Sequence, residues 1–246
     1  MQKVALITGA SGGVGQSLAA ILAADGWTLV LAGRDRARLA HAYGDAHLQI
    51  EADCSTVAGA RRIFEVAREH ALLPTALAHC VGNIRLGAMH RMAEVDFTEC
   101  LNANLVSAFH TLAAFVGNLR EAKSPGAAVL VSSAAARIGT PNHEAIAAAK
   151  AGVEGLVRGA AATHAPAGIR INAVAPGIMD TPAAAAVLAN ASVREAAARQ
   201  YPQPGIGSSE ELAGLMAWLL SEQAARVTGQ VWSMDGGFSS VRPLVK

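Results

Sequence analysis

A glycine-rich turn most constrains the fold of this chain. The turn, TGASGGVG over residues 8–15, directly follows a short apolar run and precedes a helical pattern. Backbone N–H groups at a helix N-terminus bind phosphate oxygens, and side chains there would hold the ligand away. Strand, glycine turn, helix and next strand in this order predict a dinucleotide-binding unit rather than a simple tight turn. The residues expected to contact the cofactor here are Gly9, Ser11, Gly12, Gly13, Val14 and Gly15.

Seven short apolar runs alternate with helical spacers along the chain. They are apolar throughout, which suits strands covered on both faces, and the spacers are long enough for parallel crossovers. The pattern predicts a single-domain α/β fold over residues 1–246, a doubly wound Rossmann-like fold with a seven-stranded parallel sheet and helices on both faces. The predicted strands are Val4–Thr8, Thr28–Ala32, His47–Ile50, Ala76–Cys80, Ala127–Val131, Arg170–Val174 and Gln230–Met234.

An alanine-rich amphipathic stretch follows the sixth predicted strand. It is bracketed by Pro182 and Pro202, and it indicates an insertion at about residues 182–205. We expect this insertion to act as a lid. No internal repeat and no charged or Gly/Ser-rich linker divides the chain into two domains.

The composition and charge of the chain limit the classes of partner that it can bind. Twenty basic and nineteen acidic residues give a net charge of +1, and no run of like charges could form a nucleic-acid or lipid-binding stripe. We therefore expect a small-molecule substrate, with no nucleic acid and no membrane. The three cysteines lack the close pairing of a zinc or redox motif, and the eight histidines form no paired ligand motif. These patterns predict no metal site and a cytoplasmic, reducing location.

The residues after the second predicted strand bear on cofactor choice. A carboxylate at the strand end would bind the ribose hydroxyls of NAD, but Gly33 stands there and Arg34 follows. The guanidinium of Arg34 can pair with a 2′-phosphate, so NADP(H) is preferred. Asp35 lies next to it and keeps NAD(H) possible. Alternatively, the arginines merely form the solvated start of a helix.

These motifs resemble the short-chain dehydrogenase/reductase family over nearly the whole chain. Residues 8–15 match its TGxxxGxG signature, and VTGQVWSMDGG near the C-terminus resembles its closing strand. The resemblance implies that Asn104 kinks a helix, Ser133 orients a carbonyl and Lys150 binds the ribose and lowers the pKa of a neighbouring acid. It also implies cofactor contacts at Asp53, Cys54, Gly82, Pro176, Gly177, Met179 and Thr181.

The chain departs from the family pattern in two places. The family's NNAG stretch appears here as HCVG at residues 79–82, so the side-chain amides that brace the sheet are missing. The catalytic tyrosine should stand four residues before Lys150, where this chain has Ile146. An isoleucine cannot transfer a proton, so the resemblance implies an atypical member with an altered proton donor.

His143 is one substitute for the missing phenol. A helix over residues 143–165 would place His143 on the face of Ile146 and Lys150, at i, i+3 and i+7, and imidazole titrates near pH ~6.5. The seven-residue interval from His143 to Lys150 resembles the tyrosine-to-lysine spacing of enoyl reductases. A histidine in a first helical turn is also often solvent-exposed. Tyr201 could approach the substrate on lid closure, although a tyrosine beside prolines is more often a packing anchor.

Two functions compete on these observations. The first is an NAD(P)(H)-dependent oxidoreductase acting on a small carbonyl, alcohol or enone. The second is a non-catalytic NADP(H)-binding protein with a sensor or assembly role, which would keep the glycine turn and Lys150 but would not need His143. The small-residue helix at residues 145–163 could pack against a symmetry mate. We therefore expect a homo-oligomer, a dimer or tetramer, with the homotetramer favoured.

Overall fold

The computed structural model describes residues 2–242 and contains one seven-stranded parallel sheet in the order β3-β2-β1-β4-β5-β6-β9. All seven predicted strands are present, which confirms the fold class. A separate pair of short strands, β7 (Met179–Asp180) and β8 (Gly207–Ser208), was not predicted. The strands of the main sheet are β1 (Val4–Thr8), β2 (Thr28–Gly33), β3 (Leu48–Glu51), β4 (Ala76–His79), β5 (Gly126–Val131), β6 (Ile169–Pro176) and β9 (Val231–Met234).

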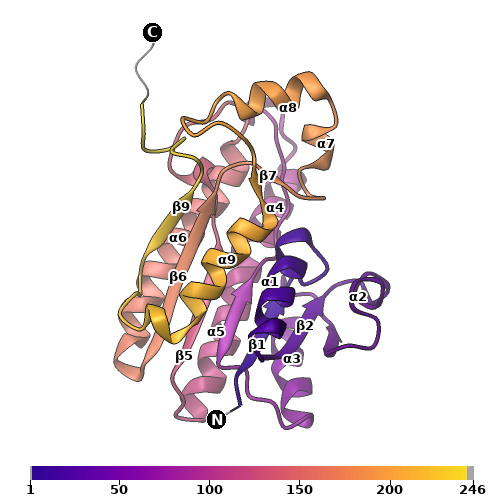
Figure 1. The fold of residues 1–246 in the computed structure, drawn as a ribbon, viewed down its shortest axis with the longest axis vertical. Coiled ribbons are helices and arrows are strands. Elements are labelled where there is room, and N and C mark those ends of the chain that lie inside the picture. The colour runs from indigo at the N-terminus through magenta and orange to yellow at the C-terminus, as the bar shows by residue number, and fades with distance from the viewer. Residues whose placement is uncertain (1, 243–246) are drawn as a thin grey trace.

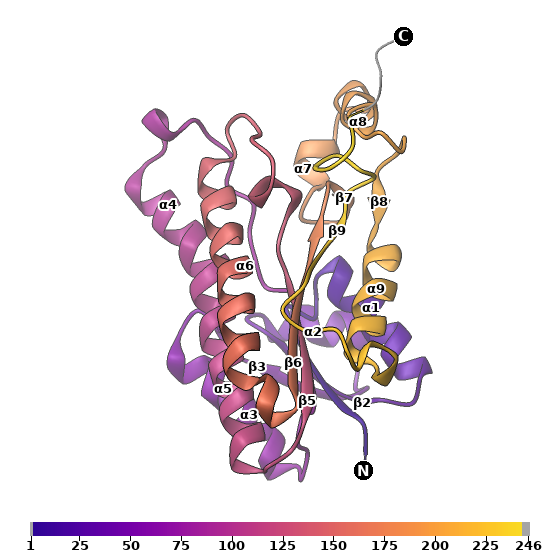
Figure 2. The ribbon, with the colours of Figure 1, turned by 90° about the vertical axis from the view of Figure 1, so that its left-hand side faces the viewer.

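Helices cover both faces of this sheet, as Figures 1 and 2 show. On one face α3, α5 and α6 pack, and on the other α1 packs beside α9. The helices are α1 (Gly13–Ala24), α2 (Arg36–Tyr43), α3 (Val57–Glu69), α4 (Glu94–Leu101), α5 (Ser107–Glu121), α6 (Glu144–His164), α7 (Ala185–Leu188), α8 (Ala191–Ala198) and α9 (Ser209–Leu220).

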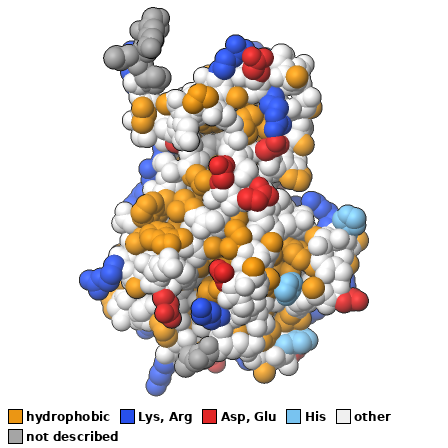
Figure 3. Space-filling model, viewed as in Figure 1, with side chains coloured by type: hydrophobic (Ala, Val, Ile, Leu, Met, Phe, Trp, Pro, Cys, Tyr) orange, Lys and Arg blue, Asp and Glu red, His pale blue; other side chains and the backbone are white. Residues whose placement is uncertain are grey.

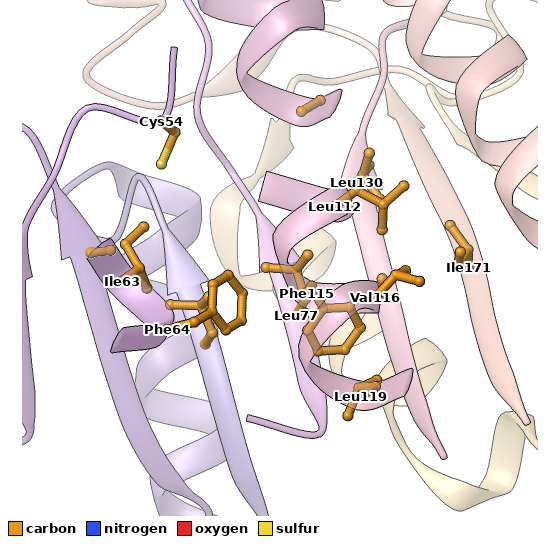
Figure 4. Packing of buried hydrophobic residues seen from close by; sticks show 14 of the residues in the cluster. Cys54, Ile63, Phe64, Leu77, Leu112, Phe115, Val116, Leu119, Leu130 and Ile171 are labelled. Carbon is orange, nitrogen blue, oxygen red and sulfur yellow. The ribbon is translucent and has the colours of Figure 1, made fainter. Parts of the chain in front are cut away.

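The largest apolar cluster lies between the sheet and α3, α5 and α6. Phe115 of α5 is fully buried, and its ring lies 6.4 Å from that of Phe64 on α3. Figure 4 shows Phe115 close to Leu77 of β4, and Phe64 and Leu130 belong to the same cluster. This cluster forms the hydrophobic core on that face of the sheet.

The strand order reverses between β1 and β4. From β1 the chain builds outward to β3 on one side, and from β4 it builds outward to β9 on the other. Ligands of open α/β sheets bind at such a switch point, outside the carboxyl ends of the strands. The glycine-rich turn leaves β1 at this place, and residues 80–82 leave β4 beside it.

The segment after β6 stands above this edge of the sheet. In Figure 1 it forms the top of the molecule, with α7 and α8 joined to the sheet through β7. This is the segment for which a lid role is predicted. Figure 3 shows charged side chains dispersed over the same view of the molecule, with no basic stripe on that face.

The helical run Glu94–Glu121 is long and apolar enough to cross a membrane by length and composition alone. It is not one uniform helix, because a π-helical turn, η2 (Asn102–Val106), separates α4 from α5. Its Leu112, Phe115 and Leu119 are buried against the sheet. The apolar character of the run is therefore explained by its packing in the core.

Candidate active site

The glycine-rich turn is shaped by close backbone contacts. Gly9 has a φ of +66°, and a Cβ there would lie 2.8 Å from the carbonyl carbon of Cys80. A Cβ on Gly15 would lie 2.7 Å from the carbonyl oxygen of Gly9. Neither position admits a side chain, so the turn remains tight against β4 and presents backbone rather than side chains. The shape of this turn is one that a dinucleotide phosphate could fit.

One hydrogen bond braces the cradle, and the start of α1 leaves its N–H groups free of side chains. The Tyr43 hydroxyl on α2 donates a hydrogen bond to the carbonyl oxygen of Ala10, at 2.7 Å. Gly12 precedes α1 in an extended conformation and supplies no side-chain cap, so no side chain occupies the first N–H groups of that helix. Ser11 and Val14 lie in the same turn, half-buried. Sequence reasoning did not assign this bracing role to Tyr43.

The region after β2 and β3 brings Arg34 and Asp53 together. Burial opposes ionisation of Asp53, but hydrogen bonds from Ser55 and the charge of Arg34 hold the pKa of this carboxyl below its usual value. Asp35 is engaged elsewhere, because its side chain accepts a hydrogen bond from Arg38 N and caps α2 at 3.0 Å. The side chain of Cys54 is buried in the core (Figure 4), so any contact with a cofactor would come from its backbone.

Asn104 and Lys150 meet at Gly82. A Cβ on Gly82 would lie 2.5 Å from Asn104 Oδ1 and 3.3 Å from Lys150 Nζ. Asn104 is fully buried in the π-helical turn, and its Nδ2 donates to Asn83 and to Cys100 O. Within residues 2–242, no group pairs with Asn104 Oδ1. A buried acceptor without a partner is costly, which favours a bound donor at this position.

Lys150 projects from α6 toward the end of β5. Its Nζ donates to Val131 O at 2.8 Å, and burial lowers the pKa of the ammonium to about 8. Ser133 follows two residues after Val131, half-buried, and its Oγ accepts a hydrogen bond from Ala135 N at 3.2 Å. The predicted serine and lysine therefore lie at the same strand end.

Ile146 fills the position of the family's tyrosine with apolar surface. It is 5% exposed and packs with Cys100, Ala145 and Ala149, and Met92 lies against this cluster. The cluster holds no hydroxyl. A cavity of about 610 Å³ lies beside it, with Met92 and Asn142 among its lining residues.

His143 lies just outside the helix that was expected to contain it. Helix α6 begins at Glu144, and His143 is the capping residue before it, half-buried, with φ −107° and ψ 13°. Its Nδ1 lies 2.8 Å from Pro141 O. A carbonyl oxygen only accepts, so Nδ1 carries a proton, and Nε2 is the atom left for other contacts.

The loop after β6 approaches the glycine-rich turn. A Cβ on Gly13 would lie 3.1 Å from Pro182 Cδ and 3.5 Å from Thr181. Pro176 ends β6, and Met179 is buried in β7. The predicted Pro176–Thr181 contacts thus lie on a loop that reaches the cradle.

Tyr201 acts as an anchor for this loop. Its phenol oxygen accepts a hydrogen bond from Ile178 N at 2.7 Å, and its ring packs on Phe238 at 5.3 Å between centroids. The phenol is tied to the loop backbone, which fits the anchor interpretation better than an acid role. Sequence reasoning missed Ile178, and no local signal marks it.

Comparisons with known proteins agree with this architecture. Residues 9–239 match the family model described as Enoyl-(Acyl carrier protein) reductase. The chain is 32% identical to cis-4-hydroxycyclohexanecarboxylate dehydrogenase of Sinomonas cyclohexanicum, covering 98% of both chains. It is 30% identical to 3beta-hydroxysteroid dehydrogenase 1 of Eggerthella lenta, over 96% of this chain and 94% of that one.

A solved structure shows the same fold. A short-chain type dehydrogenase/reductase from Mycobacterium marinum superposes with a TM-score of 0.90 at 26% identity, over 96% of this chain and 95% of that one. The fold and the matched motifs are those of a dinucleotide-dependent class of oxidoreductases. The chain belongs to the short-chain dehydrogenase/reductase family.

Proposed function

We propose that this protein is an NADP(H)-dependent oxidoreductase that acts on a small carbonyl, alcohol or enone substrate and uses a proton donor other than the family's tyrosine. The observation that carries the proposal is the convergence at Gly82, where the unpaired Asn104 Oδ1 and the Lys150 ammonium meet beside the glycine-rich turn. Buried polar groups with unused bonding capacity, next to a cradle closed to side chains, suit a bound dinucleotide.

The chain's own residues would divide the work. The turn at residues 9–15 would hold the phosphates, Lys150 the nicotinamide ribose, and the loop at residues 176–181 the nicotinamide amide. When bound, the nicotinamide supplies or accepts the hydride. Ser133 would orient the substrate oxygen at the end of β5, and the covering segment over residues 182–205 would exclude water as a lid.

His143 is our proposed proton donor. In its neutral form Nδ1–H is bound to Pro141 O, so Nε2 has only a lone pair and the imidazole can act as a base. Only the imidazolium form could donate from Nε2 to a developing alkoxide or enolate.

The residues that follow β2 bear on the choice of cofactor. Asp35 Oδ1 caps α2, so this carboxylate is already engaged in the helix rather than placed at the strand end to recognise ribose hydroxyls. Arg34 is exposed beside Asp53 and can pair with a 2′-phosphate. We propose that NADP(H) binds more tightly than NAD(H). Equal affinity for both, or unchanged discrimination in Arg34→Ala, would contradict this.

A non-catalytic NADP(H)-binding role is the second candidate. The apolar cluster around Ile146 favours it, because the position that donates the proton in the family carries no polar atom here. This role predicts tight NADPH binding with no turnover of any substrate.

We also propose that the protein is a homo-oligomer, with the tetramer as the expected form. Phe97, on α4, and Phe109, on α5, are 40% and 53% exposed although both are large and apolar. We propose that these side chains belong to the surface through which the copies associate. Light scattering after size exclusion should give a multiple of 25.1 kDa, and Phe109→Glu should lower it.

The deciding experiment titrates NADPH and then screens substrates by loss of its absorbance. The panel pairs cyclic ketones, aldehydes and enones with and without a carboxylate, because the relative from Sinomonas cyclohexanicum acts on a ring hydroxy acid by its name. His143→Ala should abolish turnover and leave NADPH affinity nearly unchanged, whereas Lys150→Ala should weaken binding. Full activity in His143→Ala would remove histidine from the mechanism. A wild-type protein that does not bind NADPH would overturn both functions.

A further inference from the structure

His79 ends β4 and lies buried between β1 and α5, at the position where the family pattern has an amide. Its Nδ1 is 2.9 Å from Thr8 Oγ1, and its Nε2 is 3.1 Å from Ser107 Oγ. All three side chains are at most 2% exposed. The side-chain amides of the family pattern are missing here, and the imidazole spans the gap between strand and helix in their place.

The π-helical turn fixes the direction of these bonds. The backbone N–H of Ser107 bonds to Asn102 O, five residues back, and not to Ala103 O as in an α-helix. The Ser107 hydroxyl donates to Ala103 O instead, at 2.7 Å. A hydroxyl has one proton, so Ser107 Oγ can only accept from His79 Nε2–H.

The tautomer of His79 follows from this. With the proton on Nε2, the neutral ring offers a lone pair at Nδ1, and Thr8 Oγ1–H must donate to it. A directed chain of hydrogen bonds thus runs from Thr8, which precedes Gly9, through His79 and Ser107 to Ala103 of the π-helical turn.

We propose that His79 is a positioning residue whose neutral Nε2–H tautomer couples the glycine-rich turn to the π-helical turn that places Asn104. Thr8 orients the entrance to the cradle, and Ala103 is the neighbour of Asn104, whose Oδ1 faces Gly82. The proposal rests on the proposed function only for its cofactor measurement.

The surroundings keep the imidazole neutral. Thr8 from β1 and Ser107 from α5 carry no charge, and burial raises the pKa of the neighbouring Cys80 thiol to about 12. The charged group that acts on the ring is Lys150 of α6. Burial and this like charge lower the pKa of His79 to about 3. A protonated ring would lose the bond from Thr8, because Nδ1 would then become a donor.

The first test reads the tautomer directly and needs no activity. In 15N-histidine-labelled full-length protein, the His79 signal, identified by its loss in His79→Gln, should show neutral Nε2–H from pH 8 down to pH 5. The side-chain amide signal of Asn104 should shift in Thr8→Val, which removes the hydroxyl at constant shape. An Nδ1–H tautomer, titration between pH 5 and 8, or an unmoved Asn104 signal would each overturn the proposal.

The second test separates positioning from bulk stability. His79→Leu should weaken NADPH binding roughly tenfold, since it removes the acceptor of the buried Thr8 hydroxyl and the donor to Ser107 Oγ. His79→Gln, which has both a donor and an acceptor, should recover part of the loss. Leu77→Ala in the same strand is the matched control, because it removes core packing and should leave NADPH affinity unchanged. Equal weakening in Leu77→Ala and His79→Leu would reduce His79 to a structural residue. If the wild type binds no NADPH, the proposed function fails and the tautomer test still decides the coupling.

Discussion

Tyr201 and Ile178 are joined by a hydrogen bond of 2.7 Å in which the backbone N–H of the loop donates to the phenol oxygen. The tyrosine ring also occupies the space that a side chain at Gly177 would need, 2.8 Å from such a Cβ. The loop proposed to hold the nicotinamide is thus held from behind by a residue of the covering segment.

Tyr201→Phe should loosen this loop without removing the ring. The variant leaves the Ile178 N–H without its partner, which costs about 1 kcal/mol of unfolding free energy, and NADPH affinity should fall several-fold. Calorimetric titration and denaturant unfolding measure the two effects. Tyr201→Ala serves as the comparison. It also loses the packing on Phe238, so its unfolding free energy and its NADPH affinity should both be lower than those of Tyr201→Phe. NADPH affinity in Tyr201→Phe equal to wild type would show that the bond does not set the loop.

Ile146→Tyr should raise ketone reduction. The position lies one helical turn before Lys150 on α6, so a phenol there could take the role of general acid, which contributes roughly a hundredfold or more in enzymes. Because Ile146 is packed against Cys100 and Met92, the larger ring should also cost about 1–3 kcal/mol of stability. Ile146→Phe has the same bulk and no hydroxyl, and it should lose stability with no gain in rate. Equal rates for the two variants would exclude the hydroxyl as the cause.

The buried carboxylate of Glu154 predicts a stability effect. It accepts hydrogen bonds from Ser132 Oγ at 3.0 Å and from Arg137 Nε at 3.1 Å, and its side chain is 9% exposed. Arg137→Ala removes a charged donor to a buried group and should cost about 2 kcal/mol in urea unfolding. Arg158 also faces Glu154, at 3.8 Å and 60% exposed, so Arg158→Ala should change stability little. Similar losses for both variants would contradict the claim that Arg137 stabilises the buried carboxylate more than Arg158 does.

Stability should depend on pH through His79. Its pKa is about 3 in the folded protein, below the ordinary 6.5, so the folded state binds fewer protons there than the unfolded state. The contribution is fully present above pH 6.5 and is lost as pH falls toward 3, at up to about 1.4 kcal/mol per pH unit. The unfolding free energy of His79→Gln, measured from pH 7 to 5, should fall less steeply than that of the wild type. Parallel curves would show that this imidazole is not buried neutral.

Local patterns predicted the strands and the glycine-rich turn because the residues that specify them are neighbours in the chain. Apolar runs identify buried strands, and a glycine where no Cβ fits identifies the turn at Gly9. Asn104, Ser133 and Lys150 came from resemblance to the family, and the structure brings Asn104 and Lys150 together at Gly82.

Contacts between distant segments could not be predicted in this way. His79 meets Thr8 and Ser107 only after β1, β4 and α5 have packed, and nothing near residue 79 encodes that meeting. The same holds for Tyr43 with Ala10. The helix start illustrates a smaller limit: Thr140, Pro141 and Asn142 signal a beginning, but α6 begins at Glu144 and leaves His143 outside.

The π-helical turn at residues 102–106 lets one continuous helical run pack against two different apolar clusters. Each residue advances an α-helix by about 100°, so one extra residue in a turn rotates the downstream part by that angle. Before the turn, Cys100 faces the cluster around Ile146, and after it Phe115 faces the sheet. The insertion works as a phase shifter between two apolar stripes, with Asn104 at the point where the phase changes. In a relative that lacks the extra residue of this turn, α5 would be rotated relative to α4. One of the two apolar faces would then lose its present packing partners.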